Sequence, residues 1–255
     1  MRKTRLRPGT ALLTLVLAAN LSAALPGDLD AAFQGIPVLF DGDWAFGVVE
    51  FDTGEKKTHN ANDRFQMEIP HLPLAALGVE LSNAGDIPLD RMIARDTFFW
   101  ERLHYAQQGG RGMCMALIWT MGEGRINEWL EGSGYTGTEI KGVFQDYPGC
   151  PVYDPNLISV SDALRFLEVV HGNMGQPSVR KIGDNPPFSD HIRETLGFDN
   201  EVYGWMDVSE GSKHLFVIVD RPDASDLGIV ILADGLDDRG DVDRGFRMLY
   251  EELSE

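Results

Sequence analysis

Apolar and polar positions predict strands at the two ends of this chain. Residues Trp44 to Phe51 are aromatic and β-branched, and a polar turn separates them from Lys57 to Asn60, so the pattern predicts a hairpin. Near the other end, His214 to Val219 and Leu227 to Ala233 are almost continuous apolar runs, typical of strands in a covered sheet. A final amphipathic helix follows them, with Asp241 as its predicted N-cap.

The middle of the chain has helical periodicity instead. The run from Met113 to Met121 is apolar enough for a buried helix, and residues 126–130 carry the apolar stripe of a second one. Ser161 is a candidate N-cap for a third helix. Residues 173–187 contain several Gly and Pro residues, which predicts an exposed loop.

Strands at both ends with helices between them predict an α+β fold. We expect an antiparallel sheet built from the N- and C-terminal segments, flanked by terminal helices, with an all-helical subdomain inserted. The length of 255 residues by itself permits one large domain or two small ones. At 43% hydrophobic residues the chain can bury a core.

The first residues have the pattern of a signal peptide. Four basic residues before position 8 precede the apolar run Ala11 to Leu21, and the small residues Ser22 to Ala24 follow it. This run is shorter than the roughly 20 residues that span a bilayer. A membrane anchor or a buried helix is the alternative. We predict that residues 1–24 are removed and that the protein is secreted or periplasmic.

The charge of the chain limits its partners. The formal net charge is −18, and removing residues 1–24 takes away four positive charges and leaves −22. Nucleic acids and anionic membranes attract clustered Lys and Arg, so neither is an expected partner of the mature chain.

Common catalytic and metal-binding motifs are absent. The sequence contains no G-x-S-x-G, H-E-x-x-H, P-loop or G-x-G-x-x-G pattern, and its histidines are not at metal-ligand spacing, so no cofactor or metal is expected. The acidic run 234–243 does not fit a calcium loop and predicts a solvated turn. Ser178 and Lys181 form one S-x-x-K pattern, but the nearby Pro and Gly residues argue against the helix that it needs.

Two cysteines, Cys114 and Cys150, are present. Export would permit a disulfide between them. Because Cys114 lies in an apolar run, a buried free thiol is an equally good interpretation.

Several segments, in order, resemble the class A β-lactamase family. Trp44 to Phe65 is similar to its first hairpin and the run into its active-site helix, and Arg125 to Thr138 (RINEWLEGSGYTGT) is similar to its V-N-x-W-L-x-x-L-G-x-x-x-T segment. Ser159 to Val170 resembles the helix after the omega loop, and Val217 to Asp238 the last two strands. The resemblance implies a single domain over 25–255, with a sheet part at about 25–66 and 198–255 and a helical part at about 67–197.

The residues that carry catalysis in that family are altered here. The resemblance places Ile69 at the nucleophilic serine and Leu72 at the lysine of the active-site helix, and neither side chain can attack a carbonyl or move a proton. The S-D-N and K-T-G motifs and the general-base glutamate also lack matches. The residues aligned with the two motifs are Gly109, Gly110 and Arg111 for the first and Thr195 and Gly197 for the second.

Two functions are therefore compatible with the sequence. In the first, the protein is exported, no longer acylates, and binds a cell-wall peptide, a small molecule or another protein. In the second, it is an active β-lactam or amide hydrolase that uses other residues, with Glu68 and His71 on one helix face as an acid–base pair. A third interpretation, an unrelated exported domain, would place the terminal strands in different sheets.

Overall fold

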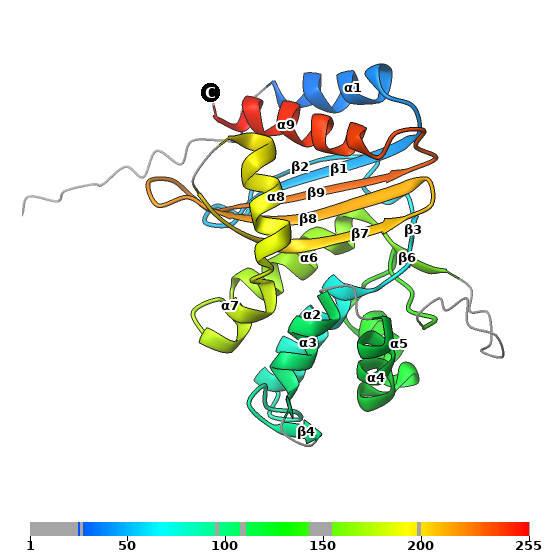
Figure 1. The fold of residues 1–255 in the computed structure, drawn as a ribbon, viewed down its shortest axis with the longest axis vertical. Helices are drawn as coiled ribbons and strands as arrows, with labels where there is room; N and C mark the ends of the chain where they lie inside the picture. The colour runs from blue at the N-terminus through cyan, green and yellow to red at the C-terminus, as the bar shows by residue number, and fades with distance from the viewer. Residues whose placement is uncertain are drawn as a thin grey trace, which may run out of the picture.

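Strands from the two ends of the chain form one sheet. The computed structural model describes Leu25 and residues 28–94, 97–107, 111–142, 155–197 and 200–254. All pairings in the sheet are antiparallel, in the order β2-β1-β9-β8-β7 (Figure 1). Its strands are β1 (Asp43–Glu50), β2 (Lys56–His59), β7 (Glu201–Ser209), β8 (Ser212–Asp220) and β9 (Leu227–Asp234). The predicted α+β sheet is confirmed, and the interpretation with separate sheets is wrong.

Helices cover both faces of this sheet. Figure 1 shows α1 (Leu29–Leu39) and α9 (Gly240–Ser254) on one face, and α6 (Val160–His171) on the other. Side chains alternate along β1, so that Phe46 packs in the apolar cluster beneath α1 and α9 while Ala45 packs in the cluster around α6. Burial on both faces explains why the strand sequences are almost continuously apolar.

The insert between β2 and β7 is mainly helical, as predicted. Two short antiparallel ladders accompany the helices: β4 pairs with the next strand, β5, whereas β3, which leads into α2, pairs with the distant β6. The elements are β3 (Phe65–Met67), α2 (His71–Asn83), β4 (Met92–Ala94), β5 (Thr97–Phe98), α3 (Phe99–Gln107), α4 (Arg111–Met121), α5 (Glu123–Gly132), β6 (Asn156–Ile158), α7 (Pro177–Gly183) and α8 (Pro186–Leu196).

Two of the predicted N-caps are wrong by a few residues. α6 begins after Ser159, whose Oγ accepts the Asp162 N–H at 3.3 Å, so Ser161 lies inside the helix. α9 begins at Gly240, whose N–H donates to the Asp238 carboxylate at 2.8 Å, and Asp241 therefore lies in the first turn. In both cases several acceptor side chains stand near the helix start, and the backbone conformation selects one of them.

The predicted loop at 173–187 is also partly helical. It contains α7, and α8 begins at Pro186, because proline is compatible with the first turn of a helix, where its missing N–H has no partner to lose. Ser178 and Lys181 are thus on a helix after all. The Lys181 ammonium lies over the Trp100 ring, 4.8 Å from its centroid.

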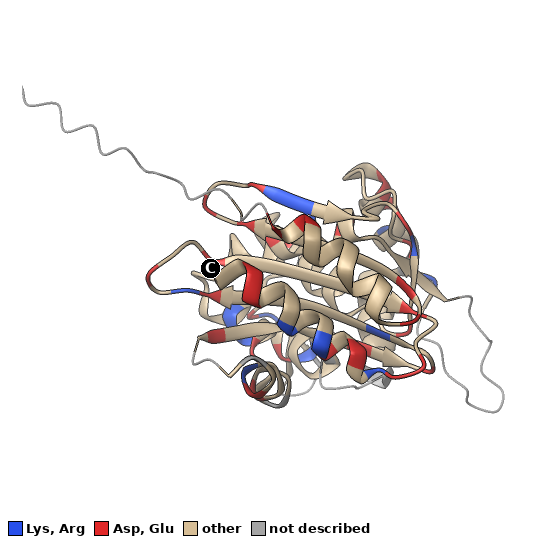
Figure 2. Ribbon diagram, turned by 90° about the horizontal axis from the view of Figure 1, so that it is seen from above, with Lys and Arg blue, Asp and Glu red and all other residues tan. Residues whose placement is uncertain are grey.

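The predicted signal peptide, residues 1–24, lies outside the described residues. Among the described residues, no helix has the length and apolar character to cross a membrane. Acidic residues of the described chain lie on several loops and helix ends, as Figure 2 shows for the α1 and α9 side.

Candidate functional site

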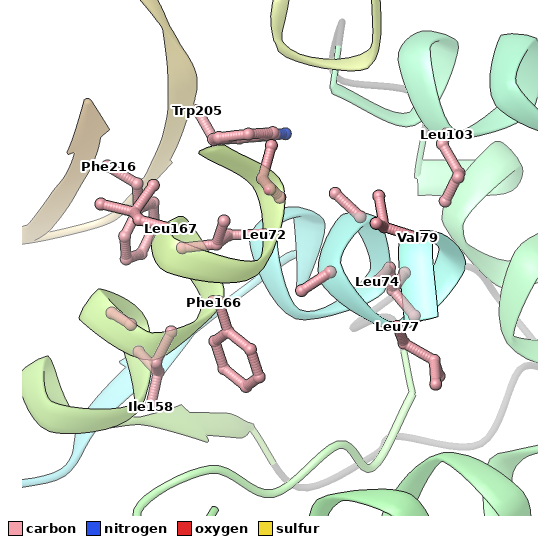
Figure 3. Packing of buried hydrophobic residues seen from close by; sticks show 14 of the residues in the cluster. Leu72, Leu74, Leu77, Val79, Leu103, Ile158, Phe166, Leu167, Trp205 and Phe216 are labelled. Carbon is pink, nitrogen blue, oxygen red and sulfur yellow. The ribbon is translucent and has the colours of Figure 1, made fainter. Parts of the chain in front are cut away.

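The N-terminus of α2 is where the sequence predicts the altered active site. Ile69 is 7% exposed and Leu72 is fully buried, and both belong to the apolar core between the sheet and the helical insert. The Leu72 side chain points from α2 toward Leu167 of α6 and Phe216 of β8 (Figure 3). At these two positions the structure has packed core instead of polar groups that face a cleft.

A buried carboxylate from β7 binds the backbone just before α2. Asp207 is 3% exposed. Its Oδ2 accepts the N–H of Glu68 at 2.8 Å and its Oδ1 accepts the N–H of Ile69 at 3.2 Å. One side chain therefore uses both oxygens on two consecutive backbone donors.

Two further side chains of the sheet bind the segment at Gln66. His214 of β8 is fully buried, and its Nε2–H donates to the Gln66 carbonyl at 2.7 Å while its Nδ1 accepts the Ala233 N–H at 3.2 Å. The Asp234 carboxylate at the end of β9 accepts the Gln66 N–H at 3.3 Å. These partners determine the His214 tautomer, with its proton on Nε2.

A fourth side chain completes this arrangement from β6. The Nδ2 of the buried Asn156 donates to the Glu68 carbonyl at 3.2 Å. Side chains from β6, β7, β8 and β9 thus hold the segment 66–69 against the sheet, and its backbone N–H and C=O groups are bonded within the protein.

Burial determines the protonation chemistry nearby. Burial raises the pKa of Asp207, and it also raises the pKa of Asp234. The thiol of Cys114 lies 3.8 Å from Nδ1 of His71. Burial raises the pKa of Cys114 to about 12 and lowers the pKa of His71 to about 3. A neutral imidazole beside a protonated thiol is not an activated nucleophile.

The architecture has clear structural relatives, although no family model and no curated protein matches the sequence. A β-lactamase from Chitinophaga pinensis superposes with a TM-score of 0.74 at 18% identity, covering 89% of this chain and 100% of that one. A β-lactamase from Xanthomonas campestris pv. campestris gives 0.71 at 17% identity, over 90% and 97% of the two chains. The reconstructed class A β-lactamase of the last common ancestor of Gram-negative bacteria gives 0.71 at 15%, over 88% and 98%.

This chain has the class A β-lactamase fold. The identities are all below one fifth, so the relatives establish the architecture and leave the chemistry to the residues of this chain.

Within the β-lactamase fold, the residues predicted as K-T-G equivalents lie at the end of α8 and not on a strand. Thr195 and Gly197 end α8, where the Thr195 carbonyl accepts from Arg247 of α9 at 2.8 Å and Gly197 has a φ of 70°. The apolar side chains of α8 pack in the cluster beneath α1 and α9, whereas Ile69 belongs to the opposite cluster. The strand residue that meets Ile69 is Asp207 instead.

The acid–base pair of the alternative function is not assembled as predicted. α2 begins at His71, so Glu68 precedes the helix and the two do not share a helix face. The described partner of the buried His71 ring is Cys114, and Glu68 is half-buried on the other side of Pro70. Arg111 begins α4, while Gly109, Gly110 and Cys150 lie outside the described residues.

Sequence reasoning missed the three residues that organise this site, Asp207, His214 and Asp234. A signal for them existed, because each is a polar residue within or at the end of an apolar strand. Asp207 and His214 are direct cross-strand neighbours in the ladder between β7 and β8. This strand pairing brings Asp207 beside His214, and Asp234 lies 3.7 Å from the His214 Nε2, so the three polar residues form one cluster.

Proposed function

We propose that this protein is a β-lactamase-like protein that forms no acyl-enzyme and acts by binding a ligand. The observation that carries the proposal is the Asp207 carboxylate on the N–H groups of Glu68 and Ile69. Acyl transfer needs backbone donors that are free to stabilise the negative oxygen of a tetrahedral intermediate. Donors that already bind a carboxylate do not serve that purpose.

The side chains on α2 support the same proposal. A covalent mechanism needs a nucleophile with an adjacent base. Ile69 and Leu72 are hydrocarbon side chains in the packed core. The Cys114 thiol, 3.8 Å from Nδ1 of His71 on α2, is buried with its pKa raised to about 12.

The alternative, an active hydrolase that uses Glu68 and His71, has less support. A general base works best with a pKa near the working pH, and burial lowers the pKa of His71 to about 3. The ring is also 5% exposed, which leaves little room for a catalytic water beside it.

The sequence supports the ligand class and the location that belong to this proposal. The basic and apolar pattern of residues 1–24 supports export to the periplasm or the medium. The family resemblance and the acidic mature chain support a cell-wall peptide, a small molecule or a protein as ligand rather than nucleic acid.

A chromogenic cephalosporin tests the absence of acylation. The mature protein is incubated with the lactam, and hydrolysis is followed by absorbance while adducts are sought by intact-mass spectrometry. We expect no turnover and no mass increase, and an active class A β-lactamase treated identically provides the positive control. A stoichiometric adduct on any residue of the wild-type protein contradicts the proposal.

The variant Ile69→Ser sharpens this test. It restores a hydroxyl at the position of the nucleophile but leaves Asp207 on the backbone donors, so we expect it to remain free of adduct. Ile69→Val is the matched control for the packing change. Acylation of Ile69→Ser, but not of Ile69→Val, would show that Asp207 on the backbone donors does not prevent the reaction.

A further inference from the structure

Asp207 is bound in the way that proteins bind a free carboxylate. Its two oxygens receive one N–H each from Glu68 and Ile69, at 2.8 and 3.2 Å, and its side chain is shielded from solvent. The donors come from residues 138 and 139 positions away in the sequence, so local chain geometry does not impose the contact.

The two donors lie just before a helix that lacks an acid in its own first turn. α2 has 13 residues, no acidic residue in its first turn, and no capping hydrogen bond from the side chain of its N-cap, Pro70. The partial positive charge of a helix N-terminus favours an anion. In this fold the acid next to the helix start is Asp207 of strand β7, which binds the backbone just before α2.

Burial makes the environment of this carboxylate unfavourable, which makes its presence informative. Burial raises the pKa of Asp207, whereas His214, directly across the ladder, and the two backbone donors act in the opposite direction. The Asp234 carboxylate lies 3.7 Å from the His214 Nε2. A buried carboxylate in such surroundings persists only where strong donors compensate for its lost hydration.

We propose that the N–H groups of Glu68 and Ile69 form an anion site in which Asp207 is the tethered ligand, and that this site binds a small free carboxylate once the side chain is removed. This inference rests on the proposed function in one respect: no substrate is expected to bind the Glu68 and Ile69 N–H groups. The ligand class is a carboxylate of one or two carbons, because the space released is that of the Asp207 side chain.

Rescue by added salts tests this proposal. In Asp207→Ala the two N–H groups lose their acceptor, and we expect a lower melting temperature than in the wild type. Sodium formate should restore part of the loss, by about 3 °C at ten times its dissociation constant. Asp207→Gly should respond to acetate in the same way. Sodium chloride at equal ionic strength measures the effect of screening.

Asp207→Asn is the matched control, because its amide fills the space and leaves no room for formate. A formate response equal to that of chloride, or equal in the Ala and Asn variants, overturns the proposal. If Asp207→Ala does not fold at 25 °C, recovery of its far-UV circular dichroism is compared in the two salts. Recovery in formate alone supports the site, and no recovery in either overturns it.

The two proposals can fail separately. The lactam experiment uses the wild-type protein and detects acylation, whereas the salt experiment uses variants and detects anion binding without any lactam.

Discussion

Buried polar side chains in this protein connect segments that are far apart in the sequence. Asp207 joins β7 to the start of α2, and Asn156 accepts from Lys141 and Gly142 while it donates to Glu68. Asp162 of α6 accepts the Gly137 N–H at 2.8 Å and the Thr138 hydroxyl at 2.9 Å. Each of these side chains makes several hydrogen bonds inside the protein, and these bonds compensate for the hydrogen bonds to water that it loses on burial.

The Asp162 carboxyl should make stability depend on pH. Burial raises its folded-state pKa, whereas the unfolded value is about 3.9. The folded state then holds the proton more tightly, so this group's stabilising contribution is complete below the unfolded pKa and is lost as the pH rises through the folded pKa. We expect the unfolding free energy of the wild type, minus that of Asp162→Asn, to decrease from about pH 4 upward.

Urea unfolding of the wild type and of Asp162→Asn, from about pH 4 upward, measures this difference in unfolding free energy. The Asp162→Asn variant serves as the reference because an amide does not titrate. A difference that stays constant or increases with pH contradicts the expected direction.

At the scale of elements, close contact between layers depends on particular small residues. A Cβ added at Gly47 of β1 would lie 2.4 Å from Cγ1 of Val160 and 2.9 Å from Cδ1 of Leu164, both on α6. Glycine at this point lets α6 pack directly against the sheet. That position of α6 in turn brings Leu167 toward Leu72 of α2.

Gly47→Ala should therefore destabilise the protein, by about 1–3 kcal/mol, because the added methyl group forces α6 away from β1. Gly35→Ala is the matched control. Gly35 lies in α1 with no heavy atom within 4 Å of an added Cβ, and we expect it to stabilise the protein by about 0.5–1 kcal/mol through helix propensity. Urea unfolding measures both variants. Equal effects of the two substitutions on the unfolding free energy would show that the close contact of Gly47 with α6 does not exclude a larger side chain.

At the scale of the whole molecule, the sheet separates two apolar cores while the surface carries a large negative charge. One core lies beneath α1 and α9, and the other joins the sheet to the helical insert. The chain has a formal net charge of −18, and the acidic residues of its described part lie on several loops and helix ends (Figure 2), so their repulsion acts across much of the molecule.

Salt should therefore stabilise the folded protein. Raising sodium chloride shortens the Debye length from about 30 Å at 0.01 M to about 8 Å at 0.15 M, so we expect the melting temperature to rise over this range. Replacing the exposed acids Asp223, Asp237 and Glu251 by their amides should reduce the rise. A melting temperature that falls with salt, or a rise that the amide variant keeps in full, would contradict this explanation.

Local patterns in the sequence predicted most elements of the fold. The apolar runs predicted β8 and β9, the aromatic segment predicted β1, and the 126–130 stripe predicted α5. The apolar identities of Ile69 and Leu72 were also visible in the sequence. These features depend on neighbours a few residues away, since hydrophobic periodicity reports which face of an element is buried.

Only the tertiary structure decided which distant residues meet. The sequence pointed to Thr195 as the strand residue near Ile69, but α8 continues to Leu196 and places Thr195 beneath α9. The ladder of β7 with β8 brings Asp207 beside His214, and the sheet carries both to the segment before α2. The sequence by itself determined that this chain builds a covered antiparallel sheet with a helical insert and has no Ser–Lys pair at the start of α2. Strand register and layer packing decided that Asp207 occupies the backbone donors there, because a contact across 138 residues leaves no local pattern in the chain.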